Sequence, residues 1–184
     1  MRTDFDNRGP FGFAFDRRGD LTLAEFVGGG AEDGHPTGSA GTYRIERDGR
    51  LTPISKAVGD HQVDTCWVVN NGRYAFGSNY TSGTISSWKI GPDGGLTLLH
   101  EVAGTTQKSA NSQGSTPLDL GVSPDGRFLY NVLPGSGKVA AWKIGADGGL
   151  TKIGEFGGLP QTVNGDHAPR DFSALGSPAG IDVM

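Results

Sequence analysis

Short runs of Val, Leu, Ile, Phe, Tyr and Trp alternate along the chain with groups of Gly, Asp, Asn and Pro. Each apolar run has the length of one β-strand, and the polar, glycine-rich groups between the runs are typical of tight turns. No stretch keeps apolar residues at the spacing of one helix face, so no helix is predicted. The pattern therefore predicts an all-β chain of short strands.

The strand pattern repeats along the chain. Residues 71–76 match residues 125–130, and residues 88–97 match residues 142–151, both with an offset of 54 residues. A weaker copy at 43–52 lies 45 residues before the second copy. Periods of about 40–50 residues with four strand signals each indicate the blades of a β-propeller. We therefore predict three four-stranded blades, at about residues 10–58, 62–104 and 116–158, followed by a C-terminal tail or closing strand at 159–184.

Within each blade the strands are named A to D, from the centre of the propeller outward. Strand A is predicted at 11–15, 65–69 and 118–122, strand B at 21–26, 74–78 and 128–132, strand C at 41–45, 84–90 and 138–144, and strand D at 51–56, 96–102 and 150–156. Asp-Gly and Asn-Gly pairs join A to B and C to D, because these residues tolerate the positive φ of short hairpins. Strand A should line the central channel. The D–A and B–C loops then open on one rim, and the A–B and C–D loops on the other.

Composition narrows the class of protein. Apolar residues make up only 35% of the chain and 32 of its 184 residues are glycine, which would suit disorder, but the clustering of the apolar residues favours an all-β fold. The net charge is −4 without a basic stripe, so nucleic acid is not an expected partner. No apolar run is long enough to span a membrane. No signal peptide pattern opens the chain, which makes a cytoplasmic location the default and leaves export through an upstream signal open.

The chain has one cysteine, Cys66, within the apolar run 66–69. One cysteine excludes an intrachain disulfide and a cysteine-based zinc site, and neither a metal nor a cofactor is predicted. Cys66 is expected to be a small buried residue. Trp88 and Trp142 fall at the same position of successive repeats, which indicates packing between blades.

A set of segments carries a family resemblance: 9–15, 66–69, 72–75, 84–86, 117–120, 123–130 and 158–160. Together they resemble the bacterial lactonase family of seven-bladed propellers, which includes 6-phosphogluconolactonase-like and carboxymuconate-cyclase-like proteins. In that family the segments belong to the C-terminal half. Three blades are too few for a closed propeller, so we expect an incomplete ring, seven-bladed by the resemblance, that N-terminal blades or further copies of the chain complete. The resemblance also implies a metal-independent lactonase that acts on a sugar or carboxylated lactone at the central channel.

Lactone hydrolysis requires a base that activates water, donors for the developing oxyanion, and a cationic group if the substrate is phosphorylated or carboxylated. The blade scheme brings three histidines to the rim formed by the D–A and B–C loops, while His100 falls on an outer strand. The candidate catalytic residues are His61, Asp64 and His167, and the candidate substrate-binding residues are Arg170, Lys108, Asp119 and His35. In this hypothesis His61 is the base and Asp64 orients it. Loop histidines are common in propellers, so each histidine could instead be an ordinary loop residue, and Asp119 could cap a loop amide.

Two alternatives to an enzyme stay open. The chain could be a non-catalytic propeller whose rim loops, including the polar stretch 105–115, bind a partner or ligand. It could also be a fragment without independent activity. Fold alone does not decide between these functions.

Overall fold

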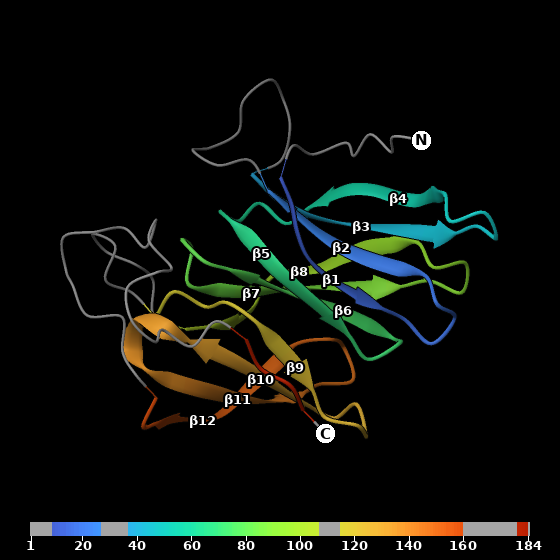
Figure 1. The fold of residues 1–184 in the computed structure, drawn as a ribbon. Helices are drawn as coiled ribbons and strands as arrows, with labels where there is room; N and C mark the ends of the chain where they lie inside the picture. Colours follow the sequence, from blue (N-terminus) through green and yellow to red (C-terminus); the bar gives the residue numbers. More distant parts are fainter. Residues whose placement is uncertain (1–8, 27–36, 107–114, 160–179, 184) are drawn as a thin grey trace.

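The computed structural model describes residues 9–26, 37–106, 115–159 and 180–183, and these residues form three four-stranded antiparallel sheets (Figure 1). The strands of the three sheets in chain order are β1 (Pro10–Phe15), β2 (Leu21–Phe26), β3 (Gly38–Ile45) and β4 (Leu51–Gly59); β5 (Thr65–Asn70), β6 (Tyr74–Asn79), β7 (Thr84–Ile90) and β8 (Leu96–Thr105); and β9 (Leu120–Val122), β10 (Phe128–Leu133), β11 (Lys138–Ile144) and β12 (Leu150–Gly157). Each sheet pairs its strands in sequence order, as a propeller blade does. The prediction of an all-β propeller with four strands per blade is confirmed.

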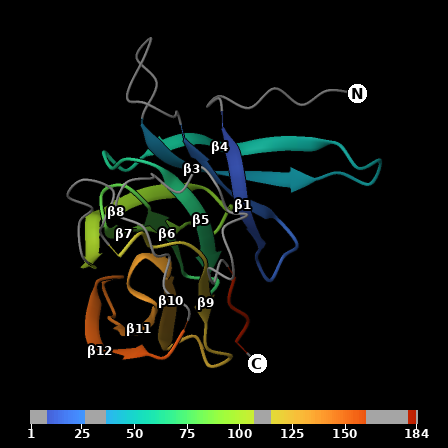
Figure 2. The same cartoon turned by 60° about the vertical axis from the view of Figure 1, so that its left-hand side comes forward.

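The first, fifth and ninth strands run along one side of the three-blade array, and β4, β8 and β12 lie farthest from them (Figures 1 and 2). The inner strand β1 lies against β5, which in turn lies against β9. These inner strands are the predicted strands A, and the order from β1 to β4 is the predicted order from A to D. The predicted strands match the observed ones within a few residues at each end.

Strand β9 begins two residues later than predicted, at Leu120. Residues 118 and 119 still exchange backbone hydrogen bonds of 3.0 Å with Val132, and the side-chain amide of Asn131 donates further bonds to the backbone carbonyls of Leu118 and Asp119, at 3.2 and 3.0 Å. A second departure is a single turn of 3-10 helix, η1 (Pro134–Ser136), in the connection from β10 to β11. Among the described residues this turn is the one helical element.

The hairpins between strands A and B and between C and D share one construction. In the second blade, Asn71 Oδ1 accepts hydrogen bonds from the backbone amides of Arg73 and Tyr74, at 3.0 and 2.8 Å, and Gly72 follows with a φ of 84°. In the third blade, Asp125 Oδ1 accepts from the Arg127 amide at 3.1 Å, and Gly126 has a φ of 71°. An Asp or Asn side chain folds back on its own turn, and only the glycine after it adopts this φ without strain.

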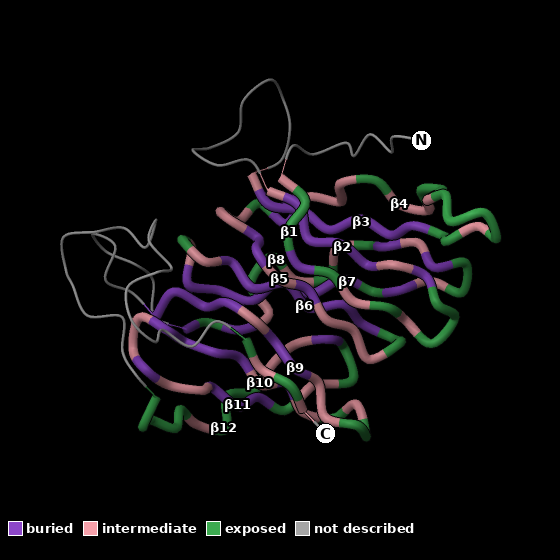
Figure 3. The backbone as a smooth tube through the Cα atoms, in the orientation of Figure 1, coloured by how far each residue is buried: buried purple, intermediate pink, exposed green. Residues whose placement is uncertain are grey.

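The apolar core lies between the blades. One cluster of side chains, which includes Trp88, joins the first and second blades, and another, which includes Trp142, joins the second and third. The middle strands β6 and β7 are buried along nearly their whole length, whereas the outer strands carry many exposed residues (Figure 3). Each blade therefore buries its faces by packing against its neighbours. Cys66 lies inside this core, as predicted, and burial raises the pKa of its thiol to about 12, with a smaller contribution from the Asp64 carboxylate.

The two tryptophans contact the outer strand of the preceding blade, which confirms their predicted role. The indole Nε1 of Trp88 donates a hydrogen bond of 3.1 Å to the backbone oxygen of Val58 in β4. The ring of Trp142 lies against Gly104 in β8, where an added Cβ would be 3.1 Å from the indole. The indole N–H of Trp142 is buried without a hydrogen-bond partner among the described residues. At this repeat position, therefore, the indole N–H of Trp88 is hydrogen-bonded and that of Trp142 is not.

This difference gives a test of what joins the blades. Trp88→Phe should lower the free energy of unfolding by about 1 kcal/mol more than Trp142→Phe, because only the first substitution removes a hydrogen bond. Urea unfolding followed by circular dichroism measures both variants against the wild type. Equal losses would mean that the bond from Trp88 to Val58 contributes nothing to the docking of the blades.

Candidate functional site

Three of the seven residues predicted for the site lie in the part of the chain that the structure describes: His61, Asp64 and Asp119. The other four, which are His35, Lys108, His167 and Arg170, lie outside the described residues, as does most of the tail 159–184. Their placement on one rim stays a prediction.

His61 and Asp64 occupy the connection from β4 to β5, both in a left-handed backbone conformation, with φ of 59° and 61°. The His61 side chain is 70% exposed, and its Nε2 lies 3.9 Å from Oε1 of Glu101 in β8. The carboxylate of Asp64 instead accepts a hydrogen bond from the hydroxyl of Thr81. The carboxylate that faces His61 is therefore Glu101, which the sequence analysis did not consider, and a pairing of His61 with Asp64 stays a prediction.

Asp119 precedes β9 and is half-buried. Its Oδ2 accepts a hydrogen bond of 3.1 Å from the backbone amide of Ile181, and its Oδ1 accepts one of 2.8 Å from Leu120. Desolvation, opposed by these two hydrogen bonds, raises the pKa of Asp119, and the Asp182 carboxylate adds to the increase. The two backbone contacts agree with the alternative in which Asp119 caps loop amides.

A buried polar network lies directly beside His61, where the second blade begins. Asp60 is fully buried, and its Oδ1 accepts a hydrogen bond of 3.0 Å from the backbone amide of Gln62. The Thr65 hydroxyl lies 3.0 Å from Asp60 Oδ2 and 2.7 Å from Asn79 Oδ1. Gly38 closes the network from the first blade, because a Cβ there would lie 2.1 Å from the Thr65 hydroxyl.

The number of protons in this network indicates the state of Asp60. The Thr65 hydroxyl has one hydrogen but faces two acceptors, Asp60 Oδ2 and Asn79 Oδ1. The Asn79 amide nitrogen donates elsewhere, to Thr84 and Ser86, so Asn79 must present its oxygen to Thr65. If the Thr65 hydroxyl donates its hydrogen to Asn79 Oδ1, the shorter of the two contacts, then the hydrogen between Thr65 and Asp60 must come from a protonated Asp60 carboxyl group. The arrangement is fully hydrogen-bonded when Asp60 is neutral.

Burial acts in the same direction. Desolvation raises the pKa of Asp60, and hydrogen bonds from Gln62, Ser86 and Thr65 only partly oppose it. The repeat did not reveal this residue, because the third blade has Gly114 and Leu133 at the positions that match Asp60 and Asn79. The sequence feature that could have indicated this network is the presence of small polar residues at the ends of otherwise apolar strands.

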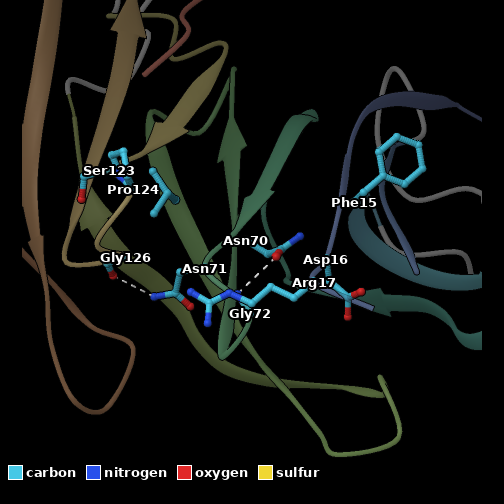
Figure 4. A pocket seen from close by; sticks show the side chains of 10 residues that line it. Phe15, Asp16, Arg17, Asn70, Asn71, Gly72, Ser123, Pro124 and Gly126 are labelled. Atoms are coloured by element: carbon cyan, nitrogen blue, oxygen red, sulfur yellow. Dashed lines mark hydrogen bonds between the residues drawn. The ribbon is translucent and has the colours of Figure 1, made fainter. Parts of the chain in front are cut away.

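At the other end of the inner strands lies an open pocket of about 240 Å³ (Figure 4). It is lined by the A–B turns of all three blades, which contribute Phe15, Asp16 and Arg17; Asn70, Asn71 and Gly72; and Val122, Ser123, Pro124 and Gly126. The Asn71 side chain donates a hydrogen bond of 3.0 Å to the Gly126 carbonyl and so joins two of the turns. Arg17 extends from the first blade across Gly72 toward Asn71. An adjoining pocket of about 280 Å³ is lined in part by Arg17, Arg18 and Arg73.

The described residues contain no group of three or more His, Cys, Asp and Glu side chains that could hold a metal ion. In the same ranges, no helix is long and apolar enough to cross a membrane.

A family model described as "Lactonase, 7-bladed beta-propeller" matches residues 26–173. A 6-phosphogluconolactonase of Formosa agariphila is 30% identical over 105 residues, a segment that covers 56% of this chain and 27% of that protein. The structure of a candidate 6-phosphogluconolactonase from Bacteroides uniformis matches with a TM-score of 0.64 and 19% identity, over 86% of this chain and 46% of that one. A Desulfotomaculum acetoxidans protein of unknown function matches with a TM-score of 0.62 and 18% identity, over 87% and 45%. The chain thus spans about half the length of these structural neighbours, and the two structures support the propeller fold alone.

The network around Asp60 predicts an unusual dependence of stability on pH. Because its pKa is raised, the folded protein keeps a proton on Asp60 at pH values where the unfolded chain has lost it, above an unfolded pKa near 3.8. The contribution of Asp60 to stability is therefore greatest below that pH and falls as the pH rises through the raised pKa. Asp60→Asn retains both hydrogen bonds with no proton to lose. At pH 7 the variant should be at least as stable as the wild type, and its advantage should shrink as the pH falls to 4.

Two further variants control this experiment, which is thermal or urea unfolding between pH 4 and 8. Asp60→Ala should cost about 1–3 kcal/mol at pH 4, because it leaves the Gln62 amide without its acceptor, and this cost relative to the wild type should shrink as the pH rises. Asp147→Asn should show the opposite slope, because hydrogen bonds led by that from the Gly149 amide lower the pKa of this exposed aspartate. An Asp60→Asn variant as unstable at pH 7 as Asp60→Ala would show that the network holds a carboxylate.

Proposed function

Since the chain belongs to the lactonase family of seven-bladed β-propellers, we propose that it forms part of a lactone hydrolase that acts at one rim of the propeller axis. The observation that carries the proposal is the family match over residues 26–173, which takes in β3 and β4 of the first blade and all of the second and third blades. The proposed substrate is a sugar lactone or a carboxylated lactone. The 6-phosphogluconolactonase name of the Formosa agariphila relative supports this class of substrate.

The proposed general base is His61. Its imidazole is exposed on the connection that leads into an inner strand, so both water and a substrate can reach it. Oε1 of Glu101, 3.9 Å from Nε2, can stabilise the imidazolium that forms when the ring takes a proton. Asp64, three residues along the same connection, is the other carboxylate that could do so. His167 is retained as a second candidate base, and Arg170, Lys108, Asp119 and His35 as candidate contacts to the substrate.

In the proposed reaction His61 removes a proton from a water molecule while the water oxygen bonds to the lactone carbonyl carbon. The negative charge that develops on the carbonyl oxygen requires hydrogen-bond donors nearby. When the ring C–O bond breaks, the imidazolium returns its proton to the leaving alkoxide, and a hydroxy acid results. No oxidant and no metal ion are needed for this balance of atoms and charges.

The direct test measures the hydrolysis of glucono-δ-lactone and of 6-phosphogluconolactone by the purified chain, after subtraction of the spontaneous rate. His61→Ala should lower kcat by about 10²–10⁴-fold, the usual contribution of a general base. His100→Ala is the matched control, because His100 lies in β8 with its Nε2 3.3 Å from the Asp147 carbonyl and outside the proposed site. Absence of turnover by a folded, monodisperse protein, or equal losses in the two variants, would contradict the proposal.

The orienting carboxylate can be identified in the same assay. Glu101→Gln should lower kcat and shift the acidic limb of the pH–rate profile to lower pH, because a neutral neighbour no longer stabilises the imidazolium. Asp64→Asn should leave that limb in place if Glu101 is the partner. A shift with Asp64→Asn and none with Glu101→Gln would restore the partner that the sequence suggested.

A further inference from the structure

The pocket in Figure 4 lies at the opposite end of the inner strands from His61. Strand β5 begins at Thr65, beside the Asp60 network, and ends at Asn70, in the wall of the pocket. At about 3.3 Å per residue, these two ends are roughly 16 Å apart. The pocket is thus separate from the proposed lactonase site.

The carboxylates around the pocket already have cationic and hydrogen-bonding partners within their own turns. The Asp16 carboxylate lies 2.6 Å from the Arg18 guanidinium, and its Oδ1 accepts the backbone amides of Arg18 and Asp20. Although burial opposes the effect, these contacts lower the pKa of Asp16. Asp125 is held in the same manner by Ser123 and Arg127, which lower its pKa to about 2. Both carboxylates are therefore anions with their charges compensated locally.

Two arginines have no such compensation: Arg17, which lines this pocket, and Arg73, which lines the adjoining pocket. Among the described residues, Arg17 has neither an ion pair nor a hydrogen bond from its guanidinium, and Arg73 has only a contact of 5.0 Å with the ring of Tyr74. The Arg17 side chain passes over Gly72, where an added Cβ would lie 3.6 Å from its Cδ and Nε. The A–B turn of the second blade thus supports an arginine that belongs to the first (Figure 4).

An unmet hydrogen-bond donor lies in the wall of the same pocket. Asn70 Oδ1 accepts the Gly72 amide at 3.2 Å, which directs the Asn70 amide nitrogen away from the turn. That nitrogen is buried and has no hydrogen-bond partner among the described residues. An unpaired buried donor is destabilising, so an acceptor brought to it would be stabilised. The pocket therefore has an uncompensated arginine, and the unused donor lies buried in its wall.

We propose that this pocket is a binding site for the oxyanion group of a small molecule, a phosphate or a carboxylate, with Arg17 as its main contact and Arg73, in the adjoining pocket, as a more distant second cation. A guanidinium suits such groups because its planar fork of N–H donors matches two oxygens at once. The open volume of about 240 Å³ admits a ligand of a few heavy atoms beside the anion. This site does not depend on the lactonase activity, since no residue proposed for hydrolysis lines it.

The test is a titration of the isotope-labelled protein with sodium phosphate and, in a second arm, with sodium gluconate, both at constant ionic strength. Amide signals of Gly72 and Gly126 should move along a saturable curve in at least one arm, and the arm with the lower Kd identifies the preferred oxyanion. Arg17→Gln should raise that Kd about tenfold, the effect of losing one charged hydrogen bond of about 1.5 kcal/mol. Arg73→Gln should raise it by a smaller factor.

Arg50→Gln is the matched control, because Arg50 is an exposed turn arginine of the first blade that pairs with Asp48 at 2.6 Å and lies away from the pocket. It removes the same charge and should leave the Kd unchanged. The proposal is overturned if neither anion gives a saturable shift, if Arg17→Gln binds like the wild type, or if Arg50→Gln weakens binding as much as Arg17→Gln.

Discussion

Each four-stranded sheet of this protein has two faces to bury, and a sheet cannot cover its own faces. The rest of the structure depends on this constraint. The second blade satisfies it on both sides: Trp88 faces the first blade, and Tyr74 and Phe76 face the third. The middle strands β6 and β7 are consequently buried along nearly their whole length, which leaves strand ends and turns as the places where charged side chains gather. Chemistry in this fold is therefore restricted to the two rims.

The two rims hold charge in different ways. At one rim the burial of Asp60 favours its neutral form, and the hydrogen bonds around it are complete with a proton on the carboxyl group. At the other rim the aspartates stay charged because turn amides and arginines stabilise them. The first arrangement fixes the connection that carries His61. The second uses up the negative charges of the turns, and so leaves Arg17 with an uncompensated positive charge.

The sequence was sufficient for the fold because the fold is a repeat. Offsets of 54 and 45 residues, together with the Asp-Gly and Asn-Gly pairs, placed twelve strands that the structure contains. The repeat could not predict the residues of the two candidate sites, because these residues differ from one blade to the next. Asp60 has no equivalent in the third blade, and Glu101, which faces His61, lies forty residues away on an outer strand. In the sequence Arg17 is an ordinary turn residue. Only the structure shows that its side chain passes over Gly72, in the turn of the neighbouring blade.

The repeat also decides how to interpret the exposed aromatic residues of β1. Tyr43 holds the position in its blade that Trp88 holds in the second, where the indole faces the first blade. Two residues along the paired strands, Phe13 holds the position of Val68, which is buried against the first blade, whereas Phe13 is 59% exposed. An open pocket of about 350 Å³ lies here, lined by Pro10, Phe11, Gly12, Phe13 and Trp67. In its walls, the Phe13 position is the one that packs blade against blade at Val68, and the rings of Phe11 and Trp67 contact each other with centroids 4.7 Å apart. None of the lining residues offers a charged group to a ligand. By that comparison the aromatic surface is a blade face, and the polar pocket at Arg17 is the better candidate for a ligand.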